Sequence, residues 1–415
     1  MKHFVQSVKN LYHLAQAVAA NIYFEFPSRK LYVIGVTGTD GKTTTTSMIY
    51  HILKTAGKRV AMISTVGAFI GDNVYDVGFH VTNPAPFALQ KFIREVTDSG
   101  NDYLVLEVTS HGLDQNRVWG VPFAIGVLTN ITGEHLDYHG TIGEYARVKL
   151  KLLARAGAAI VNADDPESQR VLKKIPRDRI RRYAVDSEPA EYTSKSFPIA
   201  TSLQGIFNRY NALAAFAACR EAGIDAKIIR TALKSFRPPV GRQEIVYDED
   251  FRIMIDFAHT PNAFANLLSG IRGMVEGKLI HVFGSAGLRD RGKRPEMGRE
   301  AARRDDVIIL TAEDPRSESA DAIAGEIAAG FGNGWMQTTR DDIRKDTGKQ
   351  GRKLYAVIPD RRDAISFAIA IARKGDLVLL TGKSHEKSIN LGSGEEPWDE
   401  FAAVRDGLKG RKTAG

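Results

Sequence analysis

Residues 36–44 are Val36-Thr37-Gly38-Thr39-Asp40-Gly41-Lys42-Thr43-Thr44, and they follow the apolar run Leu31–Gly35. The run predicts a buried strand, the glycines predict a tight turn, and a helix is expected to begin near Lys42. Such a turn directs backbone N–H groups and a helix N-terminus at an anion, with Lys42 as a point charge and Thr43 as a magnesium ligand. A strict P-loop has glycine in place of Val36. The stretch therefore predicts a variant of the nucleoside triphosphate site.

The composition is that of an ordinary soluble protein with anionic partners. The chain has 415 residues, of which 43% are hydrophobic and 26% are charged, and this predicts two or three folded domains. The net charge of +8 suggests anionic partners. Lysine and arginine are dispersed along the chain, and no nucleic-acid-binding motif accompanies them. Phosphorylated small molecules are therefore the expected partners, rather than nucleic acid.

The cysteine count and the apolar runs indicate in which cellular compartment the protein is expected. Cys219 is the only cysteine, which excludes intramolecular disulfides and cysteine-based zinc sites and favours a reducing compartment, the cytoplasm. No apolar run approaches the roughly 20 residues that span a bilayer, and no signal-peptide cleavage profile is present. Residues 1–30 are expected to form a helical segment with one stripe docked on the protein body. The stripe consists of Leu11, Leu14, Ala15, Val18 and Ile22.

Strand-like and helix-like runs alternate from Leu31 onward, which predicts an α/β protein with mainly parallel sheets covered by helices. Residues 238–241, Pro-Pro-Val-Gly, interrupt the alternation and separate a central domain, residues 31–237, from a C-terminal domain, residues 238–415. A cleft between the two is the expected place for a small-molecule site. The expected strands are 31–36, 59–63, 103–108, 125–128, 159–161, 253–257, 279–283, 307–311, 354–357 and 377–380. The expected helices are 42–56, 87–99, 143–156, 208–222, 262–272, 295–304, 320–329, 363–373 and 399–408.

Three further features of the central domain could carry chemistry. Glu107 ends the strand Tyr103–Val108, where a carboxylate can hold the magnesium that bridges phosphates, and an ordinary strand-end acid is the alternative. Loop 129–140 is rich in histidine and acids, which makes it a metal or catalytic candidate, although two histidines alone are more often structural. Lys149 lies in an apolar setting on helix 143–156, and burial lowers the pKa of a lysine so that it can react as a neutral amine. An exposed lysine covering apolar surface is the alternative.

A series of motifs lies in order along nearly the whole chain after about residue 30. They are Thr37–Thr44, Glu107–Arg117, Thr129–Lys149, Asn162–Pro166, Gly205–Asn208, Gly241–Arg242, Asp256–Pro261, Phe283–Met297, Glu313–Arg316 and Gly382–Glu386. Together they resemble the Mur ligases, ATP-dependent amide ligases of peptidoglycan precursor synthesis, and most of all the branch that adds the third amino acid. The resemblance implies a P-loop-type central domain with a mainly parallel sheet, followed by a Rossmann-like C-terminal α/β domain.

The resemblance also implies a reaction. ATP phosphorylates a substrate carboxylate, and an amine attacks the acyl phosphate to form an amide, so electrostatic positioning of the phosphate should dominate catalysis. Two magnesium ions are implied, and Lys149 is carbamylated by carbon dioxide to become an anionic ligand. The implied metal ligands are Thr43, Glu107, His135 and Lys149. The implied catalytic residues are Lys42, Glu107, His135, Lys149, Arg242 and Asp256. The implied nucleotide contacts are Gly38, Thr39, Asp40, Gly41, Lys42, Thr43, Thr44, Asn208, Arg242 and His259.

Two further groups of residues match the positions that bind substrates in the family. The residues implied for a muramoyl-dipeptide acceptor are Thr82, Asn83, Thr109, Gln115 and Arg117. The residues implied for the incoming amino acid are Asp314, Arg316, Arg361, Gly382 and Glu386. An arginine that grips a carboxylate, beside an acid that receives an ammonium, suits a zwitterionic diamino acid. Surface ion pairing is the alternative for Arg316 and Arg361.

The chain departs from the family pattern in three places. About 30 residues precede the strand of the phosphate turn. The family's N-terminal UDP-binding domain is therefore expected to be absent, and a lipid-linked or smaller acceptor becomes an alternative. The span between Asp165 and Phe207 is shorter than usual. Residues 313–316 are Glu-Asp-Pro-Arg where the family has Asp-Asn-Pro-Arg, and Ser384 replaces a glycine. Arg316 remains compatible with meso-diaminopimelate, and lysine or another amine is the alternative.

The leading hypothesis is an ADP-forming ligase that uses ATP and magnesium to join a diamino acid to a muramoyl-dipeptide-like carboxylate. It is expected to act as a monomer on small molecules in the cytoplasm. The alternatives are a related ligase for another acid such as a polyglutamate-type chain, a non-catalytic ATP-binding scaffold, and a P-loop kinase. A kinase would leave phosphate on its product. A scaffold would not require the retained set Lys42, Thr43, Glu107, His135 and Lys149.

Overall fold

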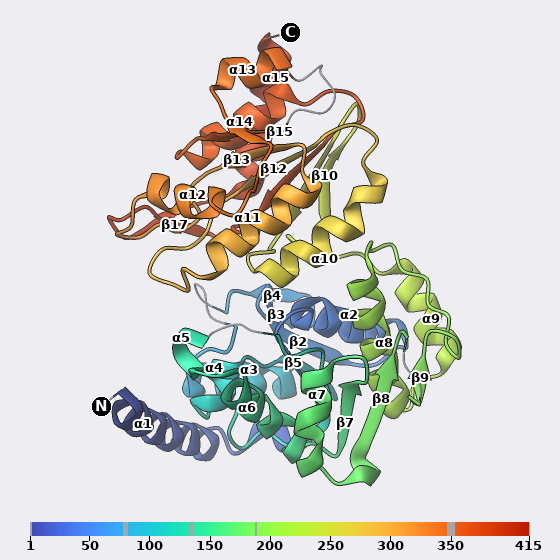
Figure 1. The fold of residues 1–415 in the computed structure, drawn as a ribbon. Helices are drawn as coiled ribbons and strands as arrows, with labels where there is room; N and C mark the ends of the chain where they lie inside the picture. Colours follow the sequence, from blue (N-terminus) through green and yellow to red (C-terminus); the bar gives the residue numbers. More distant parts are fainter. Residues whose placement is uncertain (1, 78–81, 133–135, 187–188, 347–352, 415) are drawn as a thin grey trace. The chain divides into compact units, whose positions relative to one another are not determined.

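The chain divides into two compact units, unit 1 (Met1–Pro239) and unit 2 (Val240–Gly415). The computed structural model describes residues 2–77, 82–132, 136–186, 189–346 and 353–414. Figure 1 shows that each unit is built on its own sheet with helices packed against it.

The sheet of unit 1 has the strand order β4-β3-β2-β5-β1-β6-β7-β8-β9. The strands from β2 to β9 in this order run parallel, and β3 and β4 add an antiparallel hairpin beside β2. The register pairs Val36 of β1 with Glu107 of β5, so both strands end at the same edge. The bounds are β1 Tyr32–Thr37, β2 Val60–Ser64, β3 Gly67–Ile70, β4 Asn73–Tyr75, β5 Tyr103–Glu107, β6 Phe123–Leu128, β7 Ala158–Asn162, β8 Ile180–Ala184 and β9 Tyr192–Thr193.

Helices cover both faces of this sheet, because successive side chains of a strand point to opposite sides. Ile34 and Val36 of β1 belong to an apolar cluster with α2, α8 and α9, whereas Val33 belongs to a cluster with α3 and α6. The helix bounds are α1 Lys2–Tyr23, α2 Lys42–Thr55, α3 Pro86–Asp98, α4 Ser110–Asp114, α5 Leu136–His139, α6 Ile142–Arg155, α7 Pro166–Val171, α8 Ile206–Glu221 and α9 Ala226–Ser235.

The sheet of unit 2 has the order β10-β11-β16-β12-β13-β15-β14, and β10 alone among these strands is antiparallel to its neighbour. Helices α14 and α15 pack on one face, and α10, α11 and α12 on the other. The strand bounds are β10 Glu244–Asp248, β11 Arg252–Asp256, β12 Leu279–Phe283, β13 Val307–Leu310, β14 Trp335–Gln337, β15 Lys353–Val357, β16 Leu377–Thr381, β17 Ser388–Asn390 and β18 Glu395–Pro397. The helix bounds are α10 Pro261–Ile271, α11 Lys293–Arg304, α12 Ala320–Ala328, α13 Arg340–Asp346, α14 Arg361–Ile371 and α15 Glu400–Ala414.

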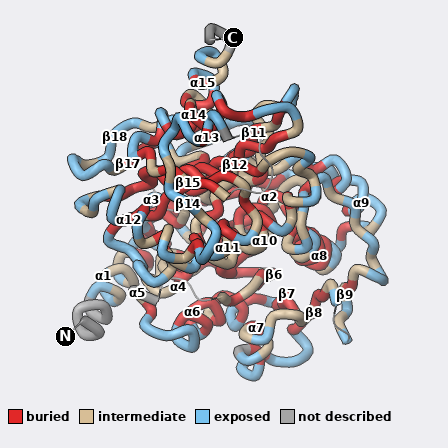
Figure 2. The backbone as a smooth tube through the Cα atoms, turned by 45° about the horizontal axis from the view of Figure 1, so that its top comes forward, coloured by how far each residue is buried: buried red, intermediate tan, exposed pale blue. Residues whose placement is uncertain are grey.

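The predicted α/β class with mainly parallel sheets is confirmed, but the docking face predicted for the N-terminal helix is wrong. Leu11 and Ile22 of α1 are 68% and 62% exposed. The helix instead buries Ala17, Ala20 and Asn21. Figure 2 colours the backbone of the chain by burial. Small side chains allow the helix to approach its neighbours closely, so Leu11 and Ile22 lie outside the contact while Leu14 and Val18 are half-buried. Within the part of the chain that the structure describes, no helix is long and apolar enough to cross a bilayer.

Candidate active site

The glycine-rich turn between β1 and α2 has no room for side chains at its two glycines. Gly41 caps the start of α2 with a φ of +80°. A Cβ there would lie 2.2 Å from Oδ1 of Asn211. A Cβ at Gly38 would lie 1.7 Å from Oγ1 of Thr129. The backbone therefore follows a path that only glycine allows, and it leads directly into the N-terminus of α2, which favours anions.

The loop after β6 holds this turn in place. The Thr39 N–H donates to the Asn130 carbonyl at 3.0 Å, and the Asp40 N–H donates to Asn130 Oδ1 at 2.9 Å. Thr129 Oγ1 donates to the Asp40 carbonyl at 2.6 Å. Tyr145 of α6 donates its hydroxyl to Thr39 Oγ1 at 3.2 Å. The turn is thus fixed before any phosphate arrives, which reduces the ordering cost of binding.

Two lysines converge on the same carbonyl of the turn. Lys42 Nζ donates to the carbonyls of Thr39 at 2.6 Å and of Gly38 at 3.2 Å. Lys149 Nζ donates to the Gly38 carbonyl at 2.5 Å and lies 4.3 Å from the centroid of the Tyr145 ring. Lys149 is only 1% exposed, so the alternative of an exposed lysine is wrong. The amine groups of two lysines therefore lie against a turn suited to phosphate.

Glu107, at the end of β5, is held by hydroxyl and backbone donors. Thr43 Oγ1 donates to Glu107 Oε1 at 3.1 Å. Thr65 donates twice, from its N–H to Oε2 at 3.1 Å and from its hydroxyl to Oε1 at 2.9 Å. An oxygen-only donor pair of a threonine and a carboxylate fits magnesium, a hard cation. His135, predicted as a further metal ligand, lies outside the described residues. Among the residues that are described, no group of three or more His, Cys, Asp or Glu side chains could hold a metal ion.

The residues predicted to bind the acceptor form one hydrogen-bonded network next to Glu107. Asn83 Nδ2 donates to the Glu107 carbonyl at 2.7 Å, and Asn83 Oδ1 accepts from the N–H and the hydroxyl of Thr109 at 2.8 and 3.0 Å. Arg117 donates to the Asn83 carbonyl at 2.5 Å and to Oε1 of Gln115 at 3.0 Å. Burial lowers the pKa of the Arg117 guanidinium. The structure thus brings these residues together, with Thr82 linked to them through Thr65 at 2.9 Å.

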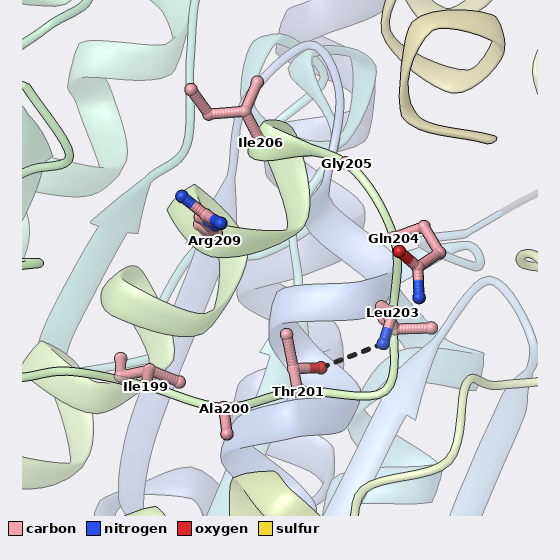
Figure 3. Close-up of a pocket in the computed structure, with 8 residues that line it drawn as sticks. All are labelled: Ile199, Ala200, Thr201, Leu203, Gln204, Gly205, Ile206 and Arg209. Carbon is pink, nitrogen blue, oxygen red and sulfur yellow. Dashed lines mark hydrogen bonds between the residues drawn. The ribbon is translucent and has the colours of Figure 1, made fainter. Parts of the chain in front are cut away.

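Asn208, predicted as a nucleotide contact, is buried in the first turn of α8. Its Nδ2 donates to the Gln204 carbonyl at 2.7 Å, and its Oδ1 accepts from Asn211 at 3.1 Å. Gln204 and Gly205 line a cavity of about 400 Å³ at this helix start, shown in Figure 3. Asn208 therefore supports the wall of a cavity large enough for part of a small ligand. The other lining residues are Ile199, Ala200, Thr201, Leu203, Ile206 and Arg209.

In unit 2, the residues predicted to act on the nucleotide gather at the end of β11. The Arg242 guanidinium lies 4.5 Å from the centroid of the Phe257 ring, a cation–π contact. Asp256 Oδ2 accepts from the N–H of Gln243 at 2.8 Å. Burial raises the pKa of Asp256, opposed by the charge of Arg242. His259 Nδ1 lies 2.8 Å from the Phe257 carbonyl, which can only accept, so Nδ1 carries the proton.

The two acids predicted to receive the incoming amine lie on either side of one buried lysine. Lys383 Nζ lies 2.9 Å from Asp314 Oδ1 and 2.7 Å from Glu386 Oε2. Gly382 has a φ of +101°, and a Cβ there would lie 2.8 Å from Glu313 Oε2. Three of the predicted residues thus share one cluster around an ammonium group that the chain itself supplies.

The two predicted arginines are placed differently from each other. Arg316, with a φ of +53°, donates to the Gly287 carbonyl at 2.5 Å. Arg361 is only 2% exposed. Its guanidinium forms a two-pronged ion pair with Glu400, at 2.9 Å from Nε to Oε2 and 2.5 Å from Nη2 to Oε1. Arg361 also donates to the Thr381 carbonyl at 2.8 Å. It is therefore neither presented to a substrate nor part of a surface ion pair, because the core of unit 2 already occupies its donors.

Sequence reasoning missed Thr65 and Lys383 as members of these clusters. Thr65 directly follows β2, which is the parallel neighbour of β5 with Ile63 opposite Leu106. Because parallel strands end at the same edge of a sheet, a threonine after β2 could have been expected near Glu107. Lys383 lies within the motif Gly382–Glu386, three residues before Glu386, but its other partner, Asp314, lies 69 residues away in the sequence and could not be expected beside it.

Comparisons with known proteins agree on one family. The model of the Mur ligase middle domain matches residues 36–219, and that of the Mur ligase glutamate ligase domain matches residues 241–384. UDP-N-acetylmuramoyl-L-alanyl-D-glutamate–2,6-diaminopimelate ligase of Geobacillus thermodenitrificans is 36% identical over 96% of this chain and 83% of its own length. A solved structure of a ligase with the same name has a TM-score of 0.61 at 29% identity, over 92% of this chain and 79% of that one. Folylpolyglutamate synthase of Mycobacterium tuberculosis has a TM-score of 0.70 at 18% identity, over 96% and 95% of the two chains, a likeness of fold alone.

Proposed function

Because the chain belongs to the Mur ligase family of ATP-dependent amide ligases, as its motifs predicted, we propose that it joins a diamino acid to UDP-N-acetylmuramoyl-alanyl-glutamate in peptidoglycan precursor synthesis. The observation that carries the proposal is one constellation in unit 1. Lys42, Lys149 and the Thr43–Glu107 pair meet at a glycine turn that is already fixed in place. The name of the Geobacillus relative supports 2,6-diaminopimelate as the amine.

In the proposed reaction, a carboxylate oxygen of the acceptor attacks the γ-phosphorus of ATP, and ADP leaves. The amine nitrogen then attacks the acyl carbon, the bond from carbon to the phosphate oxygen breaks, and inorganic phosphate leaves as the nitrogen loses a proton. Lys42 and the N–H groups of the turn hold the phosphates while their charge is redistributed. Thr43 and Glu107 are the ligands proposed for a magnesium ion, which neutralises phosphate charge when bound.

A second magnesium ion and a lysine carbamate are the finer part of the proposal. A neutral Lys149 amine would add to carbon dioxide and release one proton, which gives an anionic oxygen ligand in place of an ammonium. The burial of Lys149 against the turn supports this role, because an uncharged amine is favoured away from water. With His135, the carbamate would complete the second set of ligands.

For the amine substrate, the cluster around Lys383 supports recognition of an ammonium group. Asp314 and Glu386 carry two negative charges against the single positive charge of Lys383, so the cluster retains one net negative charge. That excess attracts a cationic amine. Arg316 donates to the Gly287 carbonyl, and it is the proposed partner for the carboxylate of the incoming amino acid. Arg361 would have to leave Glu400 before it could do the same.

The test is an assay of the purified protein with ATP, magnesium, the UDP-linked acceptor and a panel that includes diaminopimelate and lysine. Phosphate release that requires both an acceptor and an amine is expected. A stable phosphorylated product would instead identify a kinase. Tight ATP binding without turnover on any acceptor would favour a scaffold, and turnover only on glutamyl chains would favour a polyglutamate-type ligase.

The carbamate is tested by Lys149→Ala, which we expect to lower kcat by at least about a hundredfold, because it removes a charge that acts on the reacting phosphate. Acetate or bicarbonate should restore part of the activity by supplying an oxygen anion in the space left by the side chain. Arg147→Ala on the same helix is the control, since Arg147 is exposed and pairs with Glu144. Full activity of Lys149→Ala would remove the carbamate from the mechanism.

A further inference from the structure

Thr65 lies between the residue proposed to hold magnesium and the loop proposed to hold the acceptor. It follows β2 at the sheet edge where β5 ends in Glu107. Its N–H and its hydroxyl both reach the Glu107 carboxylate, at 3.1 and 2.9 Å. Its hydroxyl also lies 2.9 Å from the hydroxyl of Thr82. One side chain therefore contacts both parts of the site.

The directions of these hydrogen bonds follow from counting protons. A threonine hydroxyl has one proton and two lone pairs, and a carboxylate oxygen accepts only. The proton of Thr65 is therefore directed at Glu107 Oε1, and the contact between the two hydroxyls must have Thr82 as its donor. Thr43 donates to the same oxygen of Glu107. The result is a directed chain from Thr82 through Thr65 to the carboxylate, which Thr43 reaches from the other side.

We propose that Thr65 is a positioning residue that fixes the orientation of the Glu107 carboxylate for magnesium and links Thr82 to it. The inference rests on the proposed function for the identity of the metal and of the acceptor. Magnesium demands near-octahedral geometry, so a carboxylate that rotates freely is a poorer ligand than one held in place. Groups that orient a metal ligand without touching the metal typically alter metal affinity by about 10- to 100-fold when they are removed.

A purely structural role for the hydroxyl explains these contacts less well. Thr65 is half-buried, whereas the preceding Ser64 is buried in the sheet. A hydroxyl that only completes a turn normally bonds the backbone nearby. The Thr65 hydroxyl instead bonds two side chains, 42 and 17 residues away in the sequence. Both partners belong to the residues proposed for metal and acceptor binding.

The test measures magnesium-dependent binding of a non-hydrolysable ATP analogue by titration calorimetry, without acceptor or amine. Thr65→Val removes the hydroxyl and keeps the shape, and it should raise the magnesium concentration needed for half-maximal binding by about 10- to 100-fold. Thr65→Ser retains the hydroxyl and should stay within about twofold of the wild type. Thr97→Val is the matched control, because that hydroxyl caps its own helix by donating to the Arg94 carbonyl. Unchanged magnesium dependence in Thr65→Val would overturn the inference.

The link to Thr82 has its own readout in the same experiment. Thr82→Val should raise the magnesium requirement by a smaller factor, about two- to fivefold, because it removes only the bond that orients Thr65. The double variant should be no worse than Thr65→Val alone, and additive losses would overturn the link. Thr65→Ala provides a second test if the valine variant does not fold. The binding experiment uses no acceptor. Absence of turnover in the separate ligase assay would therefore refute the proposed function without contradicting the role inferred for Thr65.

Discussion

The phosphate turn of unit 1 and the start of α14 in unit 2 each place a cation at least half out of water, Lys42 and Arg361, but these two cations have different partners. Lys42 donates to the backbone carbonyls of Gly38 and Thr39 in the turn. Arg361 instead forms a two-pronged bond with the carboxylate of Glu400, and both side chains are fully buried. A lysine on a neutral carbonyl can transfer to an arriving phosphate at little cost. An arginine on a buried carboxylate cannot, because the partner charge would be left alone in the core.

The comparison shows how to separate binding cations from structural ones. The partner of a cation matters more than its type or its burial. A cation held by neutral acceptors keeps its full charge for a ligand, whereas a cation neutralised by a carboxylate contributes to the stability of the fold. Arg361 belongs to the second class, although its sequence position suggested the first.

The largest expected effect is on stability, in Arg361→Met. Removing one partner of a buried ion pair should destabilise unit 2 by about 3–5 kcal/mol. Urea unfolding followed by tryptophan fluorescence measures this, since Trp398 donates to Glu400 at 2.8 Å. Arg362→Met is the control, because its bond to Asp406 is exposed and worth about 1 kcal/mol or less.

Two further results would decide whether Arg361 serves the core or a substrate. A variant of normal stability with a raised KM for the amine would restore the role suggested by the sequence. Replacing both partners, with Arg361→Met and Glu400→Leu together, should recover much of the lost stability if the pair serves the core, because no unpaired charge remains.

In unit 1, Lys42→Met should lower activity and leave stability nearly unchanged, the reverse of Arg361→Met. We expect kcat to fall by about 10²- to 10³-fold, because the variant removes a charge directed at the transferring phosphoryl group. Stability should change little, since Lys42 is only half-buried and its ammonium contacts two neutral backbone carbonyls. Lys54→Met on the same helix should leave both quantities unchanged. A large loss of stability in Lys42→Met would place Lys42 in the same class as Arg361.

The smallest expected effect is a pH dependence in unit 2. Two bonds from Arg294 lower the pKa of Glu318 from 4.5 to about 2. The contribution of Glu318 to stability is therefore fully present above pH 4.5 and is lost as the pH falls toward 2. Glu318→Gln should be less stable than the wild type at neutral pH and should show a shallower decline over this window in urea unfolding. Equal slopes would mean that the pKa of Glu318 does not differ between the folded and the unfolded chain, which would contradict the prediction.

The sequence predicted the parts of the fold that local pattern determines. The alternation of apolar strands and helices gave both parallel sheets, and the glycine spacing gave the turn before α2, because each depends on neighbouring residues. The predicted strands leave out β3, β4, β8, β9, β10, β14, β17 and β18. Among these, β4, β9 and β14 have only two or three residues, which carry little periodic signal. The docking face of α1 was also missed, because contact there depends on small side chains rather than on large apolar ones.

For the candidate site too, local pattern predicted some contacts and not others. Residues that follow parallel strands were placed near one another correctly by topology alone, as Thr43 and Glu107 show. Charged residues of unit 2 could not be placed in this way, because their partners lie far along the chain. Arg361 meets Glu400 and Asp314 meets Lys383 only after the sheet has formed. The sequence alone does not show which charged side chains form ion pairs with other residues of the same chain.

The contact between Gly241 and Ser384 determines the order in which these two positions can be substituted. Ser384 has a φ of +52° and donates its hydroxyl to the Gly241 carbonyl at 2.8 Å. A Cβ on residue 241 would lie 1.8 Å from that hydroxyl oxygen. Position 384 can therefore accept glycine without any change at position 241, whereas position 241 can gain a side chain only after the serine has gone. Covariation between these two positions in descendants of this chain should run in that direction alone.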